Sequence, residues 1–415
     1  MGMKFNKTSQ LVLVSVAGLV VASLLAACQQ FTQTLTVDFV YVASALGAGP
    51  SSYGEINVFE INSQSGYMRQ IPASPFPSQG RNPIAEAVSA DYSSLFVVNQ
   101  DDNTVVQFVI GIDGKLYPYN TINTPGVFPL AVTANANEMF VLDTYQPLPI
   151  CSTASPCSGS LAVYPLTPAT KNTAITIGAP AVNAAIHANY WPLTLPGGNS
   201  SHVIVPTGVA VLANGSYVYV SAYDSSVSPT VVYIFGFSVG QGGVLTPLAG
   251  SPFAAGSKPS AIAGDATSTY VYATDFARNN VLGYSVSSGA LTPLSGSPYP
   301  AGNQPSAIVV NPSFPYVYVA NSLDATVSAF SMNNGVLTQL GTYTTGLDPV
   351  GIGIDPSTNH FVYTVNFLGN NVNNFLMSTT SGTLINTQYS PYGANAQPTA
   401  IVAIPHNGTG AGVTK

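Results

Sequence analysis

One short pattern recurs along this chain and limits its fold more than any other feature. Each copy has a proline that begins an apolar segment, then a Tyr-Val-Tyr-Val-like segment, then two further apolar segments. Most of the leading prolines are 44 to 53 residues apart, and they are Pro83, Pro129, Pro206, Pro259, Pro305, Pro349 and Pro398. A repeat of this length with four short strands is typical of the blades of a β-propeller.

Each repeated segment has the chemistry of a β-strand. The Tyr-Val-Tyr-Val-like segment alternates and is rich in β-branched and aromatic residues. A proline suits the head of the first strand, because it needs no ladder hydrogen bond there. The second residue after every leading proline is alanine or glycine, which fits the crowded inner wall of a ring. Asn or Asp follows the Tyr-Val-Tyr-Val-like segment in six copies, and we expect these residues to close turns through their own backbone.

The two ends of the repeat predict how the ring closes. Seven Tyr-Val-Tyr-Val-like segments occur, and the first of them, at residues 39–43, lacks a leading strand. The last leading strand, at residues 398–404, has no blade of its own. We therefore predict an all-β fold over residues 37–404, a seven-bladed β-propeller of four-stranded antiparallel blades. The C-terminal strand should close the ring as the innermost strand of the N-terminal blade, so that only short edges are exposed.

The repeated strings resemble those of the YVTN-type seven-bladed propellers, a family that includes bacterial lactonases of the 6-phosphogluconolactonase class. The strings are Tyr316-Val-Tyr-Val-Ala-Asn321, Tyr217-Val-Tyr-Val-Ser221, and Gly-x-Leu-Thr-Pro-Leu at residues 243–248 and 289–294. The resemblance implies the fold and favours lactone hydrolysis, but such strings build blades and name no substrate. No catalytic motif can be matched. A phosphosugar lactonase should carry basic side chains that bind the phosphate. Only seven of the nine basic residues lie outside the leader, and they are scattered along the chain, which departs from this expectation.

Residues 1–27 have the pattern of an export signal. Two lysines precede an apolar stretch from Leu11 to Leu25, which is short for a permanent membrane span. The string Leu-Ala-Ala-Cys28 resembles a bacterial lipobox, which implies cleavage before Cys28 and lipidation of this residue, with residues 28–36 as a tether. We expect an exported, lipid-anchored protein of the bacterial cell envelope, at the outer membrane or cell surface. The alternative is a soluble secreted protein in which Cys28 is incidental.

The other two cysteines, Cys151 and Cys157, predict a disulfide in an exported protein, with free thiols as the alternative. They lie in an insertion of about residues 144–203, which accounts for a gap of 77 residues between two leading prolines. The insertion also holds Trp191, which we expect either to stack on a sugar-like ligand or to anchor the insertion. His187 and His202 lack metal-ligand spacing and are expected at the surface, so no metal site is predicted.

The composition limits the partners of the chain. Charged residues make up 6 % of it, against about 25 % in average soluble proteins. An acidic chain with a net charge of −7 has no basic stripe for nucleic acid. Phosphate-loop, zinc-protease, calcium-loop and serine-elbow motifs are absent from the sequence, so we expect no cofactor. We expect a monomer, a flexible tail at residues 405–415, and little change of stability with pH because few groups titrate.

Residues that differ between the repeats are the candidates for function. The residue before each leading proline should lie at the mouth of the central channel, where propeller ligands bind. Five of these seven residues are polar and are predicted to bind a ligand, namely Asn82, Lys258, Gln304, Asp348 and Gln397. The other two are Phe128 and Val205.

Glu86 is the candidate catalytic residue. It stands where the other six copies carry Val or Ile. Burial would raise its pKa and suit it to act as a general base in lactone opening, with Arg81 polarising the carbonyl. The alternatives are an ion pair with Arg81 and a side chain in solvent.

Two functions remain open from the sequence. The first is an envelope-anchored module that binds a small sugar-like or lactone ligand or a protein partner. The second is a lactone hydrolase at the channel mouth. Convergence of Glu86, Lys258 and Asp348 in one pocket would favour the hydrolase, and a mouth filled by Phe128 would favour the binding module.

Overall fold

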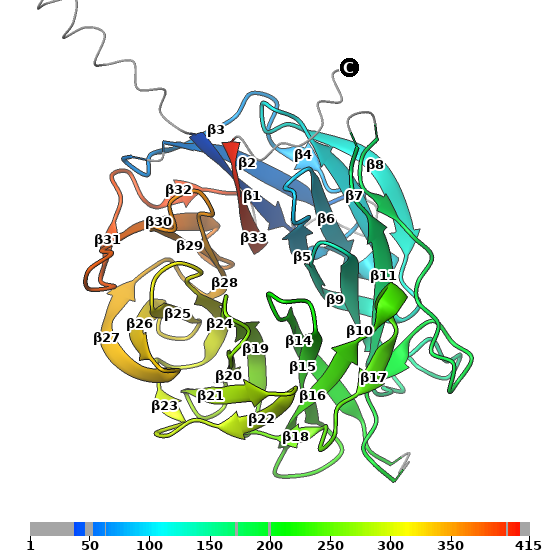
Figure 1. Cartoon of the computed structure of the whole chain (residues 1–415). Helices are drawn as coiled ribbons and strands as arrows, with labels where there is room; N and C mark the ends of the chain where they lie inside the picture. The colour runs from blue at the N-terminus through cyan, green and yellow to red at the C-terminus, as the bar shows by residue number, and fades with distance from the viewer. Residues whose placement is uncertain are drawn as a thin grey trace, which may run out of the picture. The chain divides into compact units, whose positions relative to one another are not determined.

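The computed structural model describes residues 37–45, 53–62, 64–170, 173–197, 201–395 and 397–406. Its strands form seven antiparallel sheets that are arranged as blades around a central axis (Figure 1), which confirms the predicted fold class. The predicted leader, the tether and Cys28 lie outside the described residues. No helix in the described ranges has the length and apolar character needed to cross a bilayer.

The blades follow one another along the chain, and within each blade the strands are ordered from the innermost outward. Blade 1 consists of β33 (Pro398–Pro405), β1 (Val37–Ser44), β2 (Glu55–Asn62) and β3 (Met68–Gln70), with β4 (Phe76–Pro77) beside β2. Blade 2 consists of β5 (Pro83–Val88), β6 (Ser94–Asn99), β7 (Thr104–Ile110) and β8 (Leu116–Asn123). Blade 3 consists of β9 (Val127–Ala134), β10 (Glu138–Tyr145), β11 (Ser160–Thr167) and β12 (Thr176–Ile177), with β13 (Trp191–Pro192) beside β11.

The other four blades have the same order. Blade 4 consists of β14 (Ile204–Val211), β15 (Tyr217–Asp224), β16 (Val231–Val239) and β17 (Leu245–Pro247), with β18 (Phe253–Ala254) beside β16. Blade 5 consists of β19 (Pro259–Gly264), β20 (Tyr270–Asp275), β21 (Asn280–Ser287) and β22 (Ala290–Pro293), with β23 (Tyr299–Pro300) beside β21. Blade 6 consists of β24 (Pro305–Val310), β25 (Tyr316–Asn321), β26 (Thr326–Asn333) and β27 (Val336–Thr344). Blade 7 consists of β28 (Pro349–Ile354), β29 (Phe361–Asn366), β30 (Asn371–Met377) and β31 (Leu384–Asn386), with β32 (Tyr392–Gly393) beside β30.

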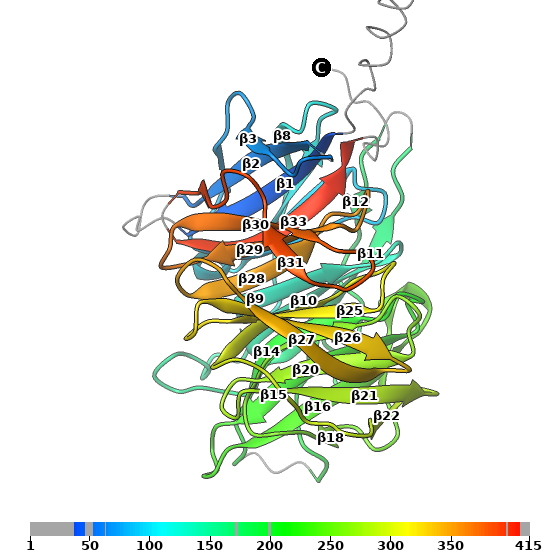
Figure 2. The same cartoon turned by 90° about the vertical axis from the view of Figure 1, so that its left-hand side faces the viewer.

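The ring closes as the sequence predicts. Strand β33 pairs with β1 in antiparallel register, with Tyr41 opposite Val402 and Phe39 opposite Ile404 (Figure 2). Each innermost strand contacts the innermost strands of both neighbouring blades, and β33 contacts β28 and β5 in this way. The last strand of the described chain therefore completes the first blade.

Every innermost strand has a register shift near its leading proline. In blade 2, Pro83 lies opposite Asn99 and Ala85 opposite Val98, so Ile84 is an extra, bulged residue. Five residues that precede these prolines have φ between 53° and 61°, namely Asn82, Phe128, Gln304, Asp348 and Gln397. In these five blades the bulge and the left-handed residue together turn the incoming loop into the ring.

Buried tyrosines connect neighbouring blades. The third residue of the Tyr-Val-Tyr-Val-like strands donates a hydrogen bond to a turn glycine of the next blade, as in Tyr272 to the carbonyl of Gly335 at 2.6 Å. The same link joins Tyr41 to Gly114, Tyr219 to Gly289 and Tyr318 to Gly382. In blade 7 the buried Tyr363 hydroxyl has no partner among the described residues, and Asn374 donates to the corresponding carbonyl of Gly66 instead.

The repeated Asn and Asp residues do more than close their own turns. They are buried, and several bind the loop that enters the innermost strand of their blade. Asp275 accepts hydrogen bonds from the backbone amides of Ser257 and Lys258 at 2.8 and 3.2 Å. Gly126 donates to Asp143 and approaches it so closely that a Cβ would lie 2.4 Å from the Asp143 side chain. The predicted turn role holds for Asp224, which accepts the amide of Ser226.

The predicted insertion at 144–203 is not one piece. It contains β11, the third strand of blade 3, which the alternating pattern did not separate from its surroundings. Residues 146–159 form a loop between β10 and β11, and a longer connection with β12 and β13 follows β11. The predicted disulfide joins Cys151 and Cys157 within the first loop, with 5.4 Å between their Cα atoms.

Candidate functional site

One face of the ring carries the loops that enter the innermost strands. The loops between the second and third strands open on the same face, because neighbouring strands in each blade are antiparallel. We call this surface the entry face. It holds all seven residues that precede the leading prolines, and with them most of the ligand-binding residues predicted from the sequence.

Lys258 lies between two aromatic rings on the entry face. Its Nζ is 5.3 Å from the ring centre of Tyr223 and 5.6 Å from that of Phe276. Cation–π attraction to both rings holds the half-buried ammonium group in place. Within the described part of the chain, no carboxylate lies within ion-pair distance of Lys258. Its positive charge therefore remains available to an anionic or polar ligand.

Further aromatic side chains continue from this lysine towards blade 3. The rings of Phe128 and Tyr145 pack edge to face with 6.1 Å between their centres. Burial, and to a lesser extent Tyr145, raises the pKa of Tyr223. We call Phe128, Tyr145, Tyr223 and Phe276 the aromatic arc. The four side chains are half-buried, so parts of them stay exposed to a ligand.

The other polar residues before the prolines are held by neighbouring turns. The Asn82 amide donates to the side chains of Gln100 and Asp101 at 3.2 and 3.1 Å. The backbone amides of Gln304 and Gln397 each donate to an asparagine side chain of the preceding blade. Burial raises the pKa of Asp348. The hydrogen bonds of Asn82, Gln304 and Gln397 fix the loop backbones around the mouth.

Glu86 lies in the packing between blades 1 and 2. Its side chain is buried, and both carboxylate oxygens are shielded from solvent without hydrogen-bond partners in the described structure. Burial raises its pKa to about 8, and the nearby backbone amides of Ala43 and Val402 offset this only in part. The raised pKa agrees with the sequence analysis, but a carboxyl in this position does not meet a substrate at the mouth.

Arg81 pairs with an aspartate and not with Glu86. Its Nε donates to Asp102 at 2.6 Å, and its backbone amide donates to the other oxygen of the same carboxylate at 2.7 Å. This pair joins the entry loop of blade 2 to the turn after β6. We therefore assign neither Glu86 nor Arg81 a catalytic role.

Trp191 anchors the insertion and does not offer its ring to a ligand. The side chain is 4 % exposed and packs among Phe140, Leu161 and other core residues between blades 3 and 4. Its indole N–H donates to the carbonyl of Leu245 at 2.9 Å. Of the two roles considered for Trp191, the structure has the anchoring one.

The structure reveals a histidine–aspartate pair that the sequence did not indicate. His202 binds the carboxylate of Asp224 through Nδ1. Asp224 is fully buried, and although burial raises its pKa, hydrogen bonds from Ser226 and His202 lower it overall. The two residues are 22 positions apart and meet only because the entry loop of blade 4 passes over the end of β15. No spacing rule would have found them.

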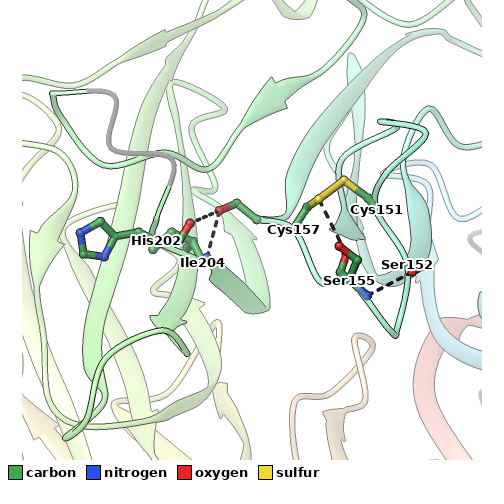
Figure 3. Close-up of a disulfide and its surroundings, with 7 residues drawn as sticks. Cys151, Ser152, Ser155, Cys157, His202 and Ile204 are labelled. Atoms are coloured by element: carbon green, nitrogen blue, oxygen red, sulfur yellow. Dashed lines mark hydrogen bonds between the residues drawn. A yellow bond between two sulfur atoms is a disulfide. The ribbon is translucent and has the colours of Figure 1, made fainter.

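A hollow of about 460 Å³ lies between the disulfide loop and the entry loop of blade 4. Its lining includes His202, Ser158, Leu148, Ile150, Leu195 and Val203. Ser158 joins the two loops, because its hydroxyl accepts the amide of Ile204 at 3.0 Å and donates to the carbonyl of His202 at 3.3 Å. Figure 3 shows this connection beside the disulfide, with the His202 ring directed away from the sulfur atoms. Among the described residues, no three His, Cys, Asp or Glu side chains form a metal-binding group.

The comparisons with known proteins agree with the fold. Residues 231–400 match the family described as "Lactonase, 7-bladed beta-propeller". No curated protein matches the chain in sequence. Among solved structures, a candidate 6-phosphogluconolactonase from Bacteroides fragilis is 18 % identical, with a TM-score of 0.67 over 90 % of this chain and 99 % of that one.

A periplasmic gluconolactonase from Pseudomonas aeruginosa is 17 % identical, with a TM-score of 0.65 over 89 % of this chain and 99 % of that one. At such identities the likeness concerns the fold and leaves the activity open. The chain is thus a seven-bladed propeller in which residues 231–400 are similar to the lactonase family.

Proposed function

We propose that this protein binds a sugar acid or its lactone on the entry face. Lys258 carries the proposal, because its ammonium group is held between two aromatic rings and has no carboxylate partner in the described structure. A ligand carboxylate or lactone carbonyl would accept hydrogen bonds from this charged donor. The apolar face of the sugar would pack on the aromatic arc. The family match, which includes Lys258 and Phe276, supports this ligand class.

Calorimetric titration with gluconate, with glucose as the neutral comparison, tests the proposal. We expect gluconate to bind and Lys258→Met to weaken it at least tenfold. Arg278→Met is the matched control, because it removes an exposed positive charge from the loop after β20 and should leave the affinity unchanged. Equal affinity of Lys258→Met and wild type, or equal binding of glucose and gluconate, would contradict the proposal.

Lactone hydrolysis is the second candidate function, and the His202–Asp224 pair favours it. A neutral imidazole can take a proton from water as the water oxygen attacks the lactone carbonyl. Asp224 would hold the Nδ1 proton and stabilise the imidazolium that forms. The ring C–O bond would then break, and the proton would pass to the departing alkoxide.

A titration of acid release from a panel of sugar lactones measures this activity. We expect His202→Gln and Asp224→Asn to lower turnover at least a hundredfold, while His187→Gln at an exposed position leaves it unchanged. Absence of turnover in the wild type, together with gluconate binding, would leave the binding function alone.

We also propose that Cys28 carries a lipid anchor, since its surroundings in the sequence form a lipobox. Expression in a bacterial host should place the protein in the detergent phase of a Triton X-114 separation. Cys28→Ser should move it to the aqueous phase. Detergent partition that does not depend on Cys28 would refute the lipid anchor.

A further inference from the structure

One turn recurs in four blades and carries a bulky residue in only one of them. It leads from the fourth strand to the short edge strand, and its fourth residue, a serine, donates its amide to the carbonyl of the first. The residue before the serine has φ between 69° and 81° and is Ala73, Gly250, Gly296 or Tyr389. A positive φ at this position of a turn favours glycine strongly. Three blades thus carry Gly or Ala where blade 7 carries a tyrosine.

Tyr389 gains little from the fold in return for this strained backbone. Its side chain is 68 % exposed, more than any other tyrosine among the described exposed hydrophobic residues. Strained backbone of this kind is found more often at functional sites than elsewhere. The contacts of its ring point to such a site.

Tyr389 meets a second tyrosine that is also specific to its blade. Tyr67 of blade 1 lies 5.7 Å from Tyr389, ring centre to ring centre, in an edge-to-face arrangement. Tyr67 follows the positive-φ glycine of the turn between β2 and β3, and the same position in other blades holds Lys115, Val244, Ala290, Val336 or Thr383. Two unusual tyrosines therefore come together from blades 1 and 7, which are neighbours in the ring (Figure 1).

The two rings border an open hollow. It measures about 510 Å³ and is lined by Tyr67, Met68, Tyr389 and Tyr392. Tyr392 is a scaffold residue, because Phe76, Phe253 and Tyr299 occupy its position in other blades. Its hydroxyl donates to the carbonyl of Gln388 and holds the strained turn in place. No charged residue of the described chain lines the hollow.

We propose that this hollow is a binding site for an uncharged carbohydrate chain, separate from the entry face. The C–H face of a pyranose packs on an aromatic ring, because the ring's negative face attracts the positive hydrogens. The absence of charge in the described lining favours a neutral ligand over a sugar acid. The volume lies in the range of about 300 to 1,000 Å³ that is usual for small-ligand sites.

Calorimetric titration of the purified protein with cellohexaose and with chitohexaose tests the site. We expect at least one of the two to bind. Tyr67→Ala and Tyr389→Gly should each weaken that binding at least tenfold, and Tyr389→Phe should retain it because the ring is kept. Tyr119→Ala is the control, since Tyr119 is a 55 % exposed tyrosine on β8. It should bind as the wild type does.

Thermal unfolding separates binding from folding. Tyr389→Gly restores the residue used in two sister turns and should unfold at the wild-type temperature or above it. The proposal fails if neither hexasaccharide binds, if Tyr389→Gly keeps full affinity, or if this variant unfolds several degrees below the wild type. It also fails if the protein self-associates and Tyr389→Gly abolishes the association, because the patch would then be a protein contact.

Discussion

Three carboxyl groups inside the propeller have raised pKa values, with burial as the main cause. The pKa is about 8 for Glu86, about 7 for Asp143 and about 6 for Asp38. Asp38 lies on β1 and accepts a hydrogen bond from the hydroxyl of Ser357 in blade 7, while Asp143 accepts one from the backbone amide of Gly126. A chain with few ionisable groups thus places three of them where their charged forms are costly.

These carboxyls give the protein an unusual dependence on pH. Folding raises their pKa values, so the folded state binds more protons than the unfolded chain between about pH 4 and pH 8. The stability that the protonated groups contribute is complete below about pH 4 and is lost as the pH rises through 6 to 8. We expect the melting temperature to fall between pH 5 and pH 8. This replaces the expectation from composition that stability varies little with pH.

Glu86→Gln isolates the largest of these contributions. The amide resembles the protonated carboxyl in shape and stays neutral at every pH. We expect the variant to melt at a higher temperature than the wild type at pH 8 and at nearly the same temperature at pH 5. Scanning calorimetry at both values measures this, and identical melting temperatures at pH 8 would show that Glu86 is not a buried charge.

At the scale of elements, the tyrosine links between blades are the clearest repeated device. Four of them bridge consecutive blades through a hydroxyl and a turn carbonyl that are both buried. A buried carbonyl that loses its donor costs about 1 to 3 kcal/mol. Because hydrogen bonds are directional and apolar contacts are not, these links help to fix the orientation of each blade relative to the next.

Tyr272→Phe and Tyr363→Phe form a matched pair of variants. The first removes the donor to Gly335, and we expect it to lower the free energy of unfolding by about 1 to 2 kcal/mol. The second removes a buried hydroxyl that has no partner among the described residues, and we expect it to be neutral or stabilising. Denaturant unfolding of both variants beside the wild type measures the difference. Equal losses would mean that the links contribute nothing beyond packing.

The strands themselves were largely predictable, while the contacts between elements were not. Alternation and a leading proline mark strands such as Pro305–Val310 and Tyr316–Asn321 directly in the sequence. Strand β11 escaped prediction because two blade-specific connections surround it and break the period. The Tyr272–Gly335 bond spans 63 residues, and only the folded ring shows that its two ends meet.

At the scale of the whole molecule, closure rests on the pairing of β1 with β33. This pairing buries Phe39, Tyr41 and Ile404 in one cluster and places β33 between the innermost strands β28 of blade 7 and β5 of blade 2. A chain without β33 would expose both the inner edge of β1 and part of that cluster. The described part of the ring has no other strand to replace it, because the innermost position of every other blade is filled from its own repeat.

Truncation tests this closure. A chain that ends at residue 397 should lose cooperative thermal unfolding and elute as aggregates on size exclusion. A chain that ends at His406 keeps β33 and should behave as the full-length protein. Cooperative unfolding of the shorter chain would mean that the ring tolerates an open blade.

The ring could be predicted in full, whereas the candidate sites could be predicted only in part, as with Lys258, and the difference has one physical reason. The same local pattern occurs seven times in the sequence, so the strand prediction from one copy is strengthened by the other copies. The sites depend on side chains that meet once, as Lys258 does with Tyr223 and Phe276 or His202 with Asp224. Glu86 illustrates the limit, because its burial and raised pKa could be predicted from its position in the repeat, while its lack of a hydrogen-bond partner among the described residues could not.

The pairing of β1 with β33 also has a consequence for folding during synthesis. The ribosome delivers the first strand of the propeller hundreds of residues before the strand that covers it. During that interval the unfinished sheet offers a bare edge to any other extended polypeptide nearby. A chaperone that shields nascent chains would therefore matter most for the N-terminal strands of this architecture. Its release would be safe only when translation is nearly complete.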